Sequence, residues 1–274
     1  MVVHLVDGTY ELFRQFYGRR RGGADRRFGA AIGVLHSVLQ MAEEGATHIG
    51  VATDHVIESF RNDLWPGYKT GLGVDPALRA QFEPLEEGLA AMGIAVWPMV
   101  ELEADDALAA ATRIAAADDG VDQVRIWTPD KDLAQCVQGN RVVQIDRRAQ
   151  SVRNEDGVWE KFGVGPALIP DLLALVGDSA DGYPGIPGIG RVTAARLVNE
   201  HGPIESFPPA VLAGERRELA LLFKDLATLR DEVDLFGGVD DLRWRGPTPA
   251  WPAWAERLGD ERLAERCRAV QPAA

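Results

Sequence analysis

The sequence has 274 residues, of which 46% are hydrophobic and 26% charged, as in an ordinary globular protein with one large domain or two unequal ones. Two cysteines exclude a disulfide scaffold, and no apolar run has the roughly 20 residues of a membrane-spanning helix or the pattern of a signal peptide. The net charge of −13 argues against extended phosphate contacts, unless the acidic residues serve another purpose. We therefore expect a monomer in a reducing compartment, with no membrane partner.

Short apolar runs alternate with longer amphipathic segments through the first half of the chain. The pattern predicts strands at 2–6, 48–53, 94–97, 124–128 and 141–145, and helices at 30–44, 76–92 and 104–117. Strands that alternate with helices in this way predict a parallel sheet with helices on both faces.

The strand pattern ends near residue 164, and helical segments follow at 166–176, 192–200 and 215–231. Between the first two lies GDSADGYPGIPGIGR (177–191), whose glycines and prolines exclude regular structure. A proline-rich connector at 244–254 leads into a last short helix. The sequence thus predicts an α/β domain over 1–163 and a helical region over 164–274.

Acidic residues gather where the predicted strands end and at the starts of two later segments. The nine acidic positions are Asp7, Asp54, Glu103, Asp105, Asp106, Asp130, Asp132, Asp178 and Asp181. Because ligands bind beyond the carboxyl ends of parallel strands, the acids that follow three different strands are expected to face one crevice. Glu103 with Asp106, and Asp178 with Asp181, are spaced three residues apart, which places each pair on one face of a helical turn.

Each of these acids taken alone is an ordinary helix cap or turn residue. Nine carboxylates at one sheet edge, however, repel one another strongly unless cations neutralise them. Oxygen ligands without histidine or cysteine favour hard cations such as Mg²⁺ or Mn²⁺. The joint pattern therefore favours a site for two divalent ions over nine independent caps.

Six short blocks make the chain resemble a known family. They are LVDG (5–8), SFR (59–61), GYK (67–69), EADD (103–106), TPDKDLAQ (128–135) and GDSADGYPGIPGIG (177–190). In wording and order they are similar to the bacterial 5′ nucleases, which include flap endonucleases and the 5′–3′ exonuclease domain of DNA polymerase I. The resemblance covers residues 1–205, and the length leaves no room for a polymerase, so the chain resembles a stand-alone member.

The resemblance implies a PIN-like domain with a parallel sheet flanked by helices and an arch at about 69–93. A helix-hairpin-helix type DNA-binding motif is implied at about 175–201. All nine acids match the family's metal ligands. Lys69 is implied to be catalytic through a contact with the scissile phosphate, and Arg61 is a second candidate. Leu72 replaces a basic residue that many relatives carry, in an acid-rich arch; on a helix it would share a face with Lys69.

Further residues are candidates for DNA and potassium contacts. A basic stretch is either a phosphate-gripping loop or a solvated surface loop, and comprises Arg19, Arg20, Arg21, Arg26 and Arg27. Tyr68 either stacks on a terminal base or belongs to the core. The hairpin residues implied to contact the duplex backbone are Gly185, Gly188, Gly190, Arg191 and Thr193. The carbonyls implied to hold K⁺ are those of Leu175, Val176, Pro184, Ile186 and Ile189.

The implied activity is that of a structure-specific 5′ nuclease, a flap endonuclease and 5′–3′ exonuclease that hydrolyses phosphodiesters by two-metal catalysis. Its substrates would be branched, flap, nicked or 5′-ended DNA in replication and repair, in the cytoplasm and associated with the nucleoid. Two alternatives stay open. One is a PIN-type ribonuclease, although such proteins are usually shorter and lack the glycine-rich hairpin. The other is a non-catalytic DNA-structure binding protein, which gains nothing from nine mutually repelling carboxylates.

Overall fold

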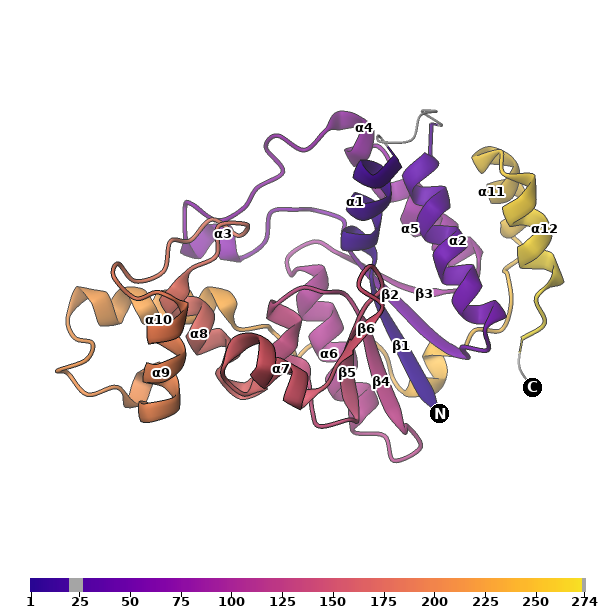
Figure 1. Ribbon diagram of the computed structural model, residues 1–274. Coiled ribbons are helices and arrows are strands. Elements are labelled where there is room, and N and C mark those ends of the chain that lie inside the picture. The colour runs from indigo at the N-terminus through magenta and orange to yellow at the C-terminus, as the bar shows by residue number, and fades with distance from the viewer. Residues whose placement is uncertain (20–26, 273–274) are drawn as a thin grey trace.

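The computed structural model describes residues 1–19 and 27–272 of the chain (Figure 1). Within these residues, six strands form one sheet in the order β3-β2-β1-β4-β5-β6. The strands are β1 (Val2–Asp7), β2 (His48–Asp54), β3 (Ala95–Met99), β4 (Gln123–Trp127), β5 (Val142–Asp146) and β6 (Ser151–Arg153). All neighbouring pairs are parallel except β5 and β6. The predicted parallel sheet is confirmed, and β6 is an antiparallel edge strand that the sequence analysis did not predict.

The described helices surround this sheet and continue beyond it. They are α1 (Gly8–Arg19), α2 (Gly29–Glu43), α3 (Arg61–Leu64), α4 (Pro76–Arg79), α5 (Phe82–Ala91), α6 (Ala104–Ala116), α7 (Glu155–Phe162), α8 (Ile169–Val176), α9 (Arg191–His201), α10 (Glu215–Ala227), α11 (Trp251–Leu258) and α12 (Glu261–Ala269). The 3₁₀ turns are η1 (Asp132–Cys136), η2 (Pro166–Leu168), η3 (Ile204–Ser206) and η4 (Val239–Leu242). No helix among the described residues combines the length and apolar character that crossing a membrane requires.

Alternating side chains of the central strands fill two separate cores. Val6 of β1 faces the core that contains α1, α2 and α5, whereas Val3 and Leu5 face the core that contains α6. Burial on both faces explains why these strands are continuous apolar runs rather than polar–apolar alternations. Helices therefore cover both faces of the sheet, as predicted, and leave the carboxyl ends of the strands as the edge where polar groups gather.

The second half of the chain builds a third core from helices alone. Helix α8 packs against both α9 and α10, and buried residues such as Leu172, Leu197 and Phe223 share one core. Figure 1 shows these helices as a separate group beside the sheet, with α6 and α7 next to it. The helical region predicted after residue 164 is thus present, and the loop between α8 and α9 carries the glycine- and proline-rich sequence.

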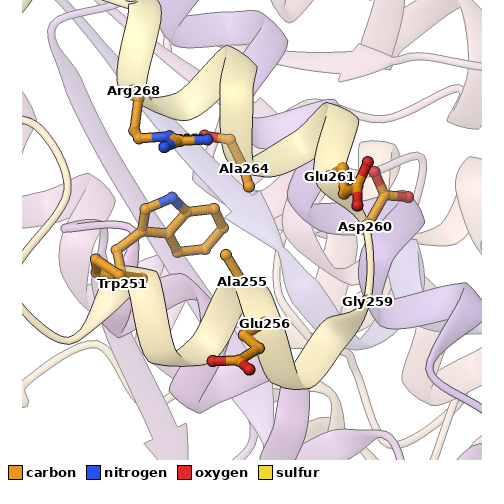
Figure 2. Close-up of a pocket in the computed structure, with 9 residues that line it drawn as sticks. Trp251, Ala255, Glu256, Gly259, Asp260, Glu261, Ala264 and Arg268 are labelled. Carbon is orange, nitrogen blue, oxygen red and sulfur yellow. Dashed lines mark hydrogen bonds between the residues drawn. The ribbon is translucent and has the colours of Figure 1, made fainter.

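The last part of the chain forms a helical hairpin rather than the single short helix predicted. Helices α11 and α12 pack on α5 and α2, and Trp251, Leu263 and Cys267 join the same core as those helices. A surface pocket of about 390 Å³ lies between the two helices of the hairpin. Figure 2 shows the side chains that line it. None of the nine predicted metal acids lines this pocket.

The segment predicted as one helix over 76–92 is interrupted, and its second half does not belong to an arch. Helices α4 and α5 are separated near Gln81, whose side-chain oxygen accepts hydrogen bonds from the backbone N–H groups of Ala30 and Ala31 at 2.9 and 3.1 Å. Gln81 thus caps the start of α2, which has no cap of its own. Helix α5 lies in the core with Leu85 and Leu89 buried, and α4 buries Leu78 in the same core. Leu72, in a non-helical stretch, is 93% exposed and shares no helix face with Lys69.

Candidate metal centre

Two of the acids end adjacent central strands. Asp7 is the last residue of β1 and Asp54 the last residue of β2. A Cβ atom at Gly8 would lie 2.8 Å from the Ala52 carbonyl oxygen, so only glycine lets α1 begin this close to β2. Asp7 accepts hydrogen bonds from the Tyr10 N–H and the Thr128 hydroxyl, while Asp54 accepts one from the Ala104 N–H. These carboxylates therefore cap helices and also face the edge of the sheet.

Five of the nine acids form two overlapping clusters at this edge. The first contains Asp105, Asp130 and Asp132, and the second contains Asp132, Asp178 and Asp181. Within each cluster one ligand atom from every residue lies within 4.8 Å of the others. The clusters combine the start of α6, the loop after β4 and the loop after α8. Asp132 belongs to both and thereby joins the sheet to the helical region.

The chemistry of these clusters fits divalent cations. Buried Asp132 Oδ1 has no hydrogen-bond partner among the described residues. Burial, together with the neighbouring Asp130 carboxylate, raises the pKa of Asp105 and of Asp132 well above the usual value. Burial also raises the pKa of Asp7 to about 7. These raised pKa values mean that nearby positive charge does not fully compensate the ionised carboxylates. A hard cation bound by their oxygen atoms supplies that charge.

Two lysines approach the second cluster. Lys69 Nζ lies 2.7 Å from Glu103 Oε2 and 3.1 Å from Asp181 Oδ1. Lys131 Nζ forms an ion pair with Asp178 and lies 3.9 Å from Asp132 Oδ2. Burial opposes ionisation of Asp178, but the Lys131 ammonium outweighs it and holds the pKa of Asp178 below its usual value. The sequence analysis did not select Lys131, although a lysine between two predicted ligands, Asp130 and Asp132, was a signal for it.

Arg61 and Asp106 form a buried ion pair with each other, which differs from the roles predicted for them. Arg61 is 1% exposed and Asp106 is 0% exposed, and the guanidinium donates to both carboxylate oxygens at 2.8 and 2.7 Å. Arg61 also donates to the Leu226 and Thr228 carbonyls, and Asp106 also accepts from the Glu103 N–H. Both carboxylate oxygens are thus occupied, and Asp106 belongs to neither cluster. The predicted metal role of Asp106 and the predicted phosphate contact of Arg61 are corrected to a structural ion pair.

Tyr68 is a core residue, which corrects its assignment as a DNA contact. Its ring is 4% exposed and packs with the helical core that includes Ala134 and Leu172. Its hydroxyl donates to Glu103 Oε2 at 3.3 Å. A base cannot stack on a ring covered in this way, so Tyr68 acts by supporting Glu103.

The loop between α8 and α9 folds into a tight turn that fits the predicted hairpin. Gly177 and Gly185 have φ values of +86° and +71°, and a Cβ atom at either position would lie within 2.6 Å of backbone atoms across the turn. The Ile186 N–H donates to the Leu175 carbonyl at 2.9 Å, which ties the two sides together. The exposed start of α9 follows, with Arg191, Val192 and Thr193 facing solvent. These residues offer backbone N–H groups and side chains to an anionic surface.

The predicted basic stretch lies mostly outside the described residues. Arg20, Arg21 and Arg26 fall outside them, and of Arg19 only the backbone, at the end of α1, is described. Arg27 is exposed, with its guanidinium 5.1 Å from the centre of the Phe28 ring. The phosphate-gripping role of this stretch therefore stays a prediction.

Two family models match consecutive parts of the chain. The 5′-3′ exonuclease N-terminal resolvase-like domain matches residues 2–163, and the 5′-3′ exonuclease C-terminal SAM fold matches residues 164–250. The sequence is 35% identical over 259 residues to DNA polymerase I of Pseudomonas aeruginosa, and 34% identical over 257 residues to that of Mycobacterium leprae. Each alignment covers 87% of this chain but 28% of the relative, so the chain spans little more than a quarter of these curated proteins.

Solved structures with the same fold include enzymes captured with metal ions or DNA. One is a flap endonuclease of bacteriophage T5 in a pseudo-enzyme-product complex with DNA and metal ions, with a TM-score of 0.69, 18% identity, and coverage of 97% of this chain and 100% of that chain. Another is the catalytic core of Rad2 with a DNA substrate, with a TM-score of 0.63, 16% identity, and coverage of 97% and 91% respectively. At these identities the likeness shows a shared fold.

Proposed function

The chain belongs to the 5′–3′ exonuclease family, and from this premise we propose that it is a structure-specific 5′ nuclease that hydrolyses DNA phosphodiesters. Its substrates are flap, nicked, branched or 5′-ended DNA met in replication and repair. The observation that carries the proposal is the pair of carboxylate clusters that share Asp132, next to the hairpin between α8 and α9. A site for two hard cations thus lies beside a surface suited to a phosphate backbone.

Mg²⁺ or Mn²⁺ is the proposed cofactor, held by the residues of the two clusters. When bound, such ions activate water and stabilise the leaving oxygen of a phosphodiester. Asp7, Asp54 and Glu103 lie near the clusters. Burial and, after it, the charges of Asp54 and Asp130 raise the pKa of Asp7, while burial and, more weakly, the charge of Glu103 raise the pKa of Asp54. In this proposal these three residues complete the negative crevice and orient the ligands.

Lys69 is the proposed contact to the scissile phosphate. Its side chain is partly exposed at the rim of the second cluster, and its backbone N–H donates to the Asp181 carbonyl at 2.9 Å. The backbone bond and the ion pairs with Glu103 and Asp181 fix the position of the ammonium before substrate arrives. A preorganised cation of this kind stabilises the charge that develops on a phosphate in the transition state.

The hairpin between α8 and α9 is the proposed grip on duplex DNA. The exposed glycines at 188 and 190 permit close approach of a phosphate backbone, and Arg191 and Thr193 add exposed donors at the start of α9. The predicted DNA contact of Gly185 is corrected to a structural role, because this residue is buried against the backbone across the turn. The proposed K⁺ ligands are the carbonyls of Leu175, Val176, Pro184, Ile186 and Ile189. Contacts of this kind read backbone shape, so little sequence preference is expected.

The test is digestion of end-labelled flap, nicked and 5′-overhang DNA with Mg²⁺ or Mn²⁺, resolved by product length. Cleavage near the flap junction or stepwise release from a 5′ end supports the proposal and ranks the two activities. Binding of all substrates without cleavage would instead indicate a DNA-structure binding protein. Cleavage of matched RNA alone would indicate a PIN-type ribonuclease. An EDTA control must abolish cleavage.

The proposal also implies where and in what form the protein works. An enzyme for branched DNA acts on the chromosome, so we place it in the cytoplasm and on the nucleoid. Residues of one chain form both carboxylate clusters. We therefore expect the monomer to be active.

A further inference from the structure

Lys131 occupies a position that the proposed reaction does not use. It lies between Asp130 and Asp132 in the sequence, directly before η1, and its ammonium points back into the second carboxylate cluster. There it pairs with Asp178 and lies 3.9 Å from Asp132 Oδ2. The buried carboxylate of Asp178 has no other side chain as its ion-pair partner among the described residues.

Lys69 and Lys131 contact different carboxylates of the second cluster. Lys69 pairs with Asp181 and with Glu103, which lies outside the cluster, so it keeps one partner if Asp181 is engaged elsewhere. Both contacts of Lys131, in contrast, are cluster carboxylates. A cation that binds Asp132 and Asp178 therefore competes with Lys131 for both of these acidic partners.

We propose that Lys131 is a built-in counter-cation of the second cluster. In the metal-free protein its ammonium neutralises the Asp178 carboxylate and lies beside Asp132, and it moves away before a divalent ion binds to these two residues. Lys131 thereby sets the metal concentration at which the second cluster fills, while the first cluster, which contacts it only through Asp132, binds metal more readily. This inference rests on the proposed function of the same site and adds to it a metal threshold within the protein.

The test is a titration with Mn²⁺ in the absence of DNA, in which binding is measured from the electron paramagnetic resonance signal of free Mn²⁺. For the Lys131→Met variant, which keeps the length of the side chain but not its charge, we expect the weaker of two Mn²⁺ sites to tighten by about tenfold. Lys131→Arg retains the charge and is expected to keep the wild-type affinity. Lys161→Met is the matched control, because Lys161 of α7 forms no ion pair with the cluster acids in the described residues.

Thermal unfolding gives an independent measurement. In EDTA the Lys131→Met variant should unfold at a lower temperature than wild type, because the buried Asp178 carboxylate loses its cation. Saturating Mn²⁺ should close most of this gap, since the metal replaces the lysine in wild type and supplies the missing positive charge in the variant. If the methionine variant does not fold, Lys131→Gln serves for the same measurements.

Two results would overturn the inference. One is an unchanged or weaker second Mn²⁺ affinity in Lys131→Met, and the other is a stability gap that Mn²⁺ leaves intact. Neither measurement involves cleavage, so both remain interpretable if the digestion of flap DNA fails. Conversely, if the wild type cleaves DNA but the Mn²⁺ affinity of Lys131→Met is unchanged, the nuclease proposal is supported and the inference about Lys131 is wrong.

Discussion

At the scale of single residues, neighbours in one motif have separate tasks. Asp105 and Asp106 are adjacent at the start of α6, yet only Asp105 joins a carboxylate cluster. Successive residues of a helix point about 100° apart, so the second acid turns inward, where Arg61 meets it. The EADD block of the sequence therefore combines a proposed metal ligand with a buried structural anchor.

These two acids should respond in opposite ways to removal. Asp106→Ala leaves the buried Arg61 guanidinium without its bidentate partner, and we expect a loss of about 3–5 kcal/mol in the free energy of unfolding. Asp105→Ala removes a carboxyl that its neighbours destabilise, so the stability in EDTA should be unchanged or higher, while cleavage falls by several orders of magnitude. Urea unfolding and single-turnover cleavage separate the two, and a stable, inactive Asp106→Ala would contradict the structural assignment.

A second prediction at this scale concerns the role of Lys69 in cleavage. Lys69→Ala should lower single-turnover cleavage of a flap substrate by at least about a hundredfold, as for loss of a preorganised donor. Leu72→Ala is the control, because this side chain is exposed and lies three residues from Lys69. Both variants are compared at one ionic strength, since salt screens the contact. A loss below about tenfold, roughly 1.4 kcal/mol, would show that Lys69 is not the principal cation.

At the scale of elements, the sequence predicted the strands and helices whose hydrophobic pattern is visible in neighbouring residues. The central strands are buried apolar runs between turn signals, and the strands predicted at 2–6 and 48–53 are confirmed as β1 and β2. The acids that follow them could be placed at one edge because parallel strands end together. Helix α1 was not predicted, although Leu12, Phe13 and Phe16 of GTYELFRQFYGR have helical spacing and pack in the core, so the local signal was present and was missed.

Other features depended on contacts between distant residues. The break between α4 and α5 follows from Gln81 capping α2, a contact over 51 positions that no local pattern reveals. Likewise, the family resemblance implied a phosphate contact for Arg61. Its partners in the structure, Asp106 and the Leu226 carbonyl, are remote in sequence, so the motif alone could not reveal them. The motif blocks thus indicated which residues matter, whereas tertiary contacts decide which of them face the crevice.

The hairpin between α8 and α9 yields a prediction at the element scale. Gly188 has a φ of +83°, and no atom lies within 4 Å of the place where a Cβ atom would be, so Gly188→Val strains the backbone without a clash. We expect weaker duplex binding by fluorescence anisotropy in EDTA. Gly139→Val is the matched control, because Gly139 has a φ of +49°, equally open surroundings and a place outside the hairpin. Equal duplex binding by wild type and Gly188→Val would reduce the hairpin to a structural turn.

At the scale of the whole molecule, the clusters make stability depend on pH. The pKa of Asp7 is raised to about 7, and those of Asp105 and Asp132 are raised as well, so the folded, metal-free protein keeps protons that the unfolded chain releases at lower pH. The stability from these groups is full below the unfolded pKa and is lost as pH rises through the folded pKa. Glu103 and Asp178 have lowered pKa values and act oppositely, but in a more acidic range.

We therefore expect the unfolding temperature in EDTA to fall between pH 5 and 7.5, because a tenfold difference in proton affinity between folded and unfolded chain is worth about 1.4 kcal/mol. Asp7→Asn should flatten part of this slope because it removes one titrating group. Saturating Mn²⁺ should also flatten it, since ionised carboxylates are then neutralised. An unfolding temperature that rises with pH across this range in EDTA would show that the clustered carboxyls are already ionised near their usual pKa.

Asp132 contributes to the cluster on the sheet side and to the one that includes the loop after α8. Any ligand that engages both clusters is therefore also a cross-link between the two halves of the chain, and its binding energy depends on their alignment. Thermodynamic reciprocity then requires that DNA which favours the aligned arrangement raises metal affinity by the same factor by which metal raises DNA affinity. A substrate that seats both halves together would recruit its own cofactor, whereas one that holds only the hairpin would not.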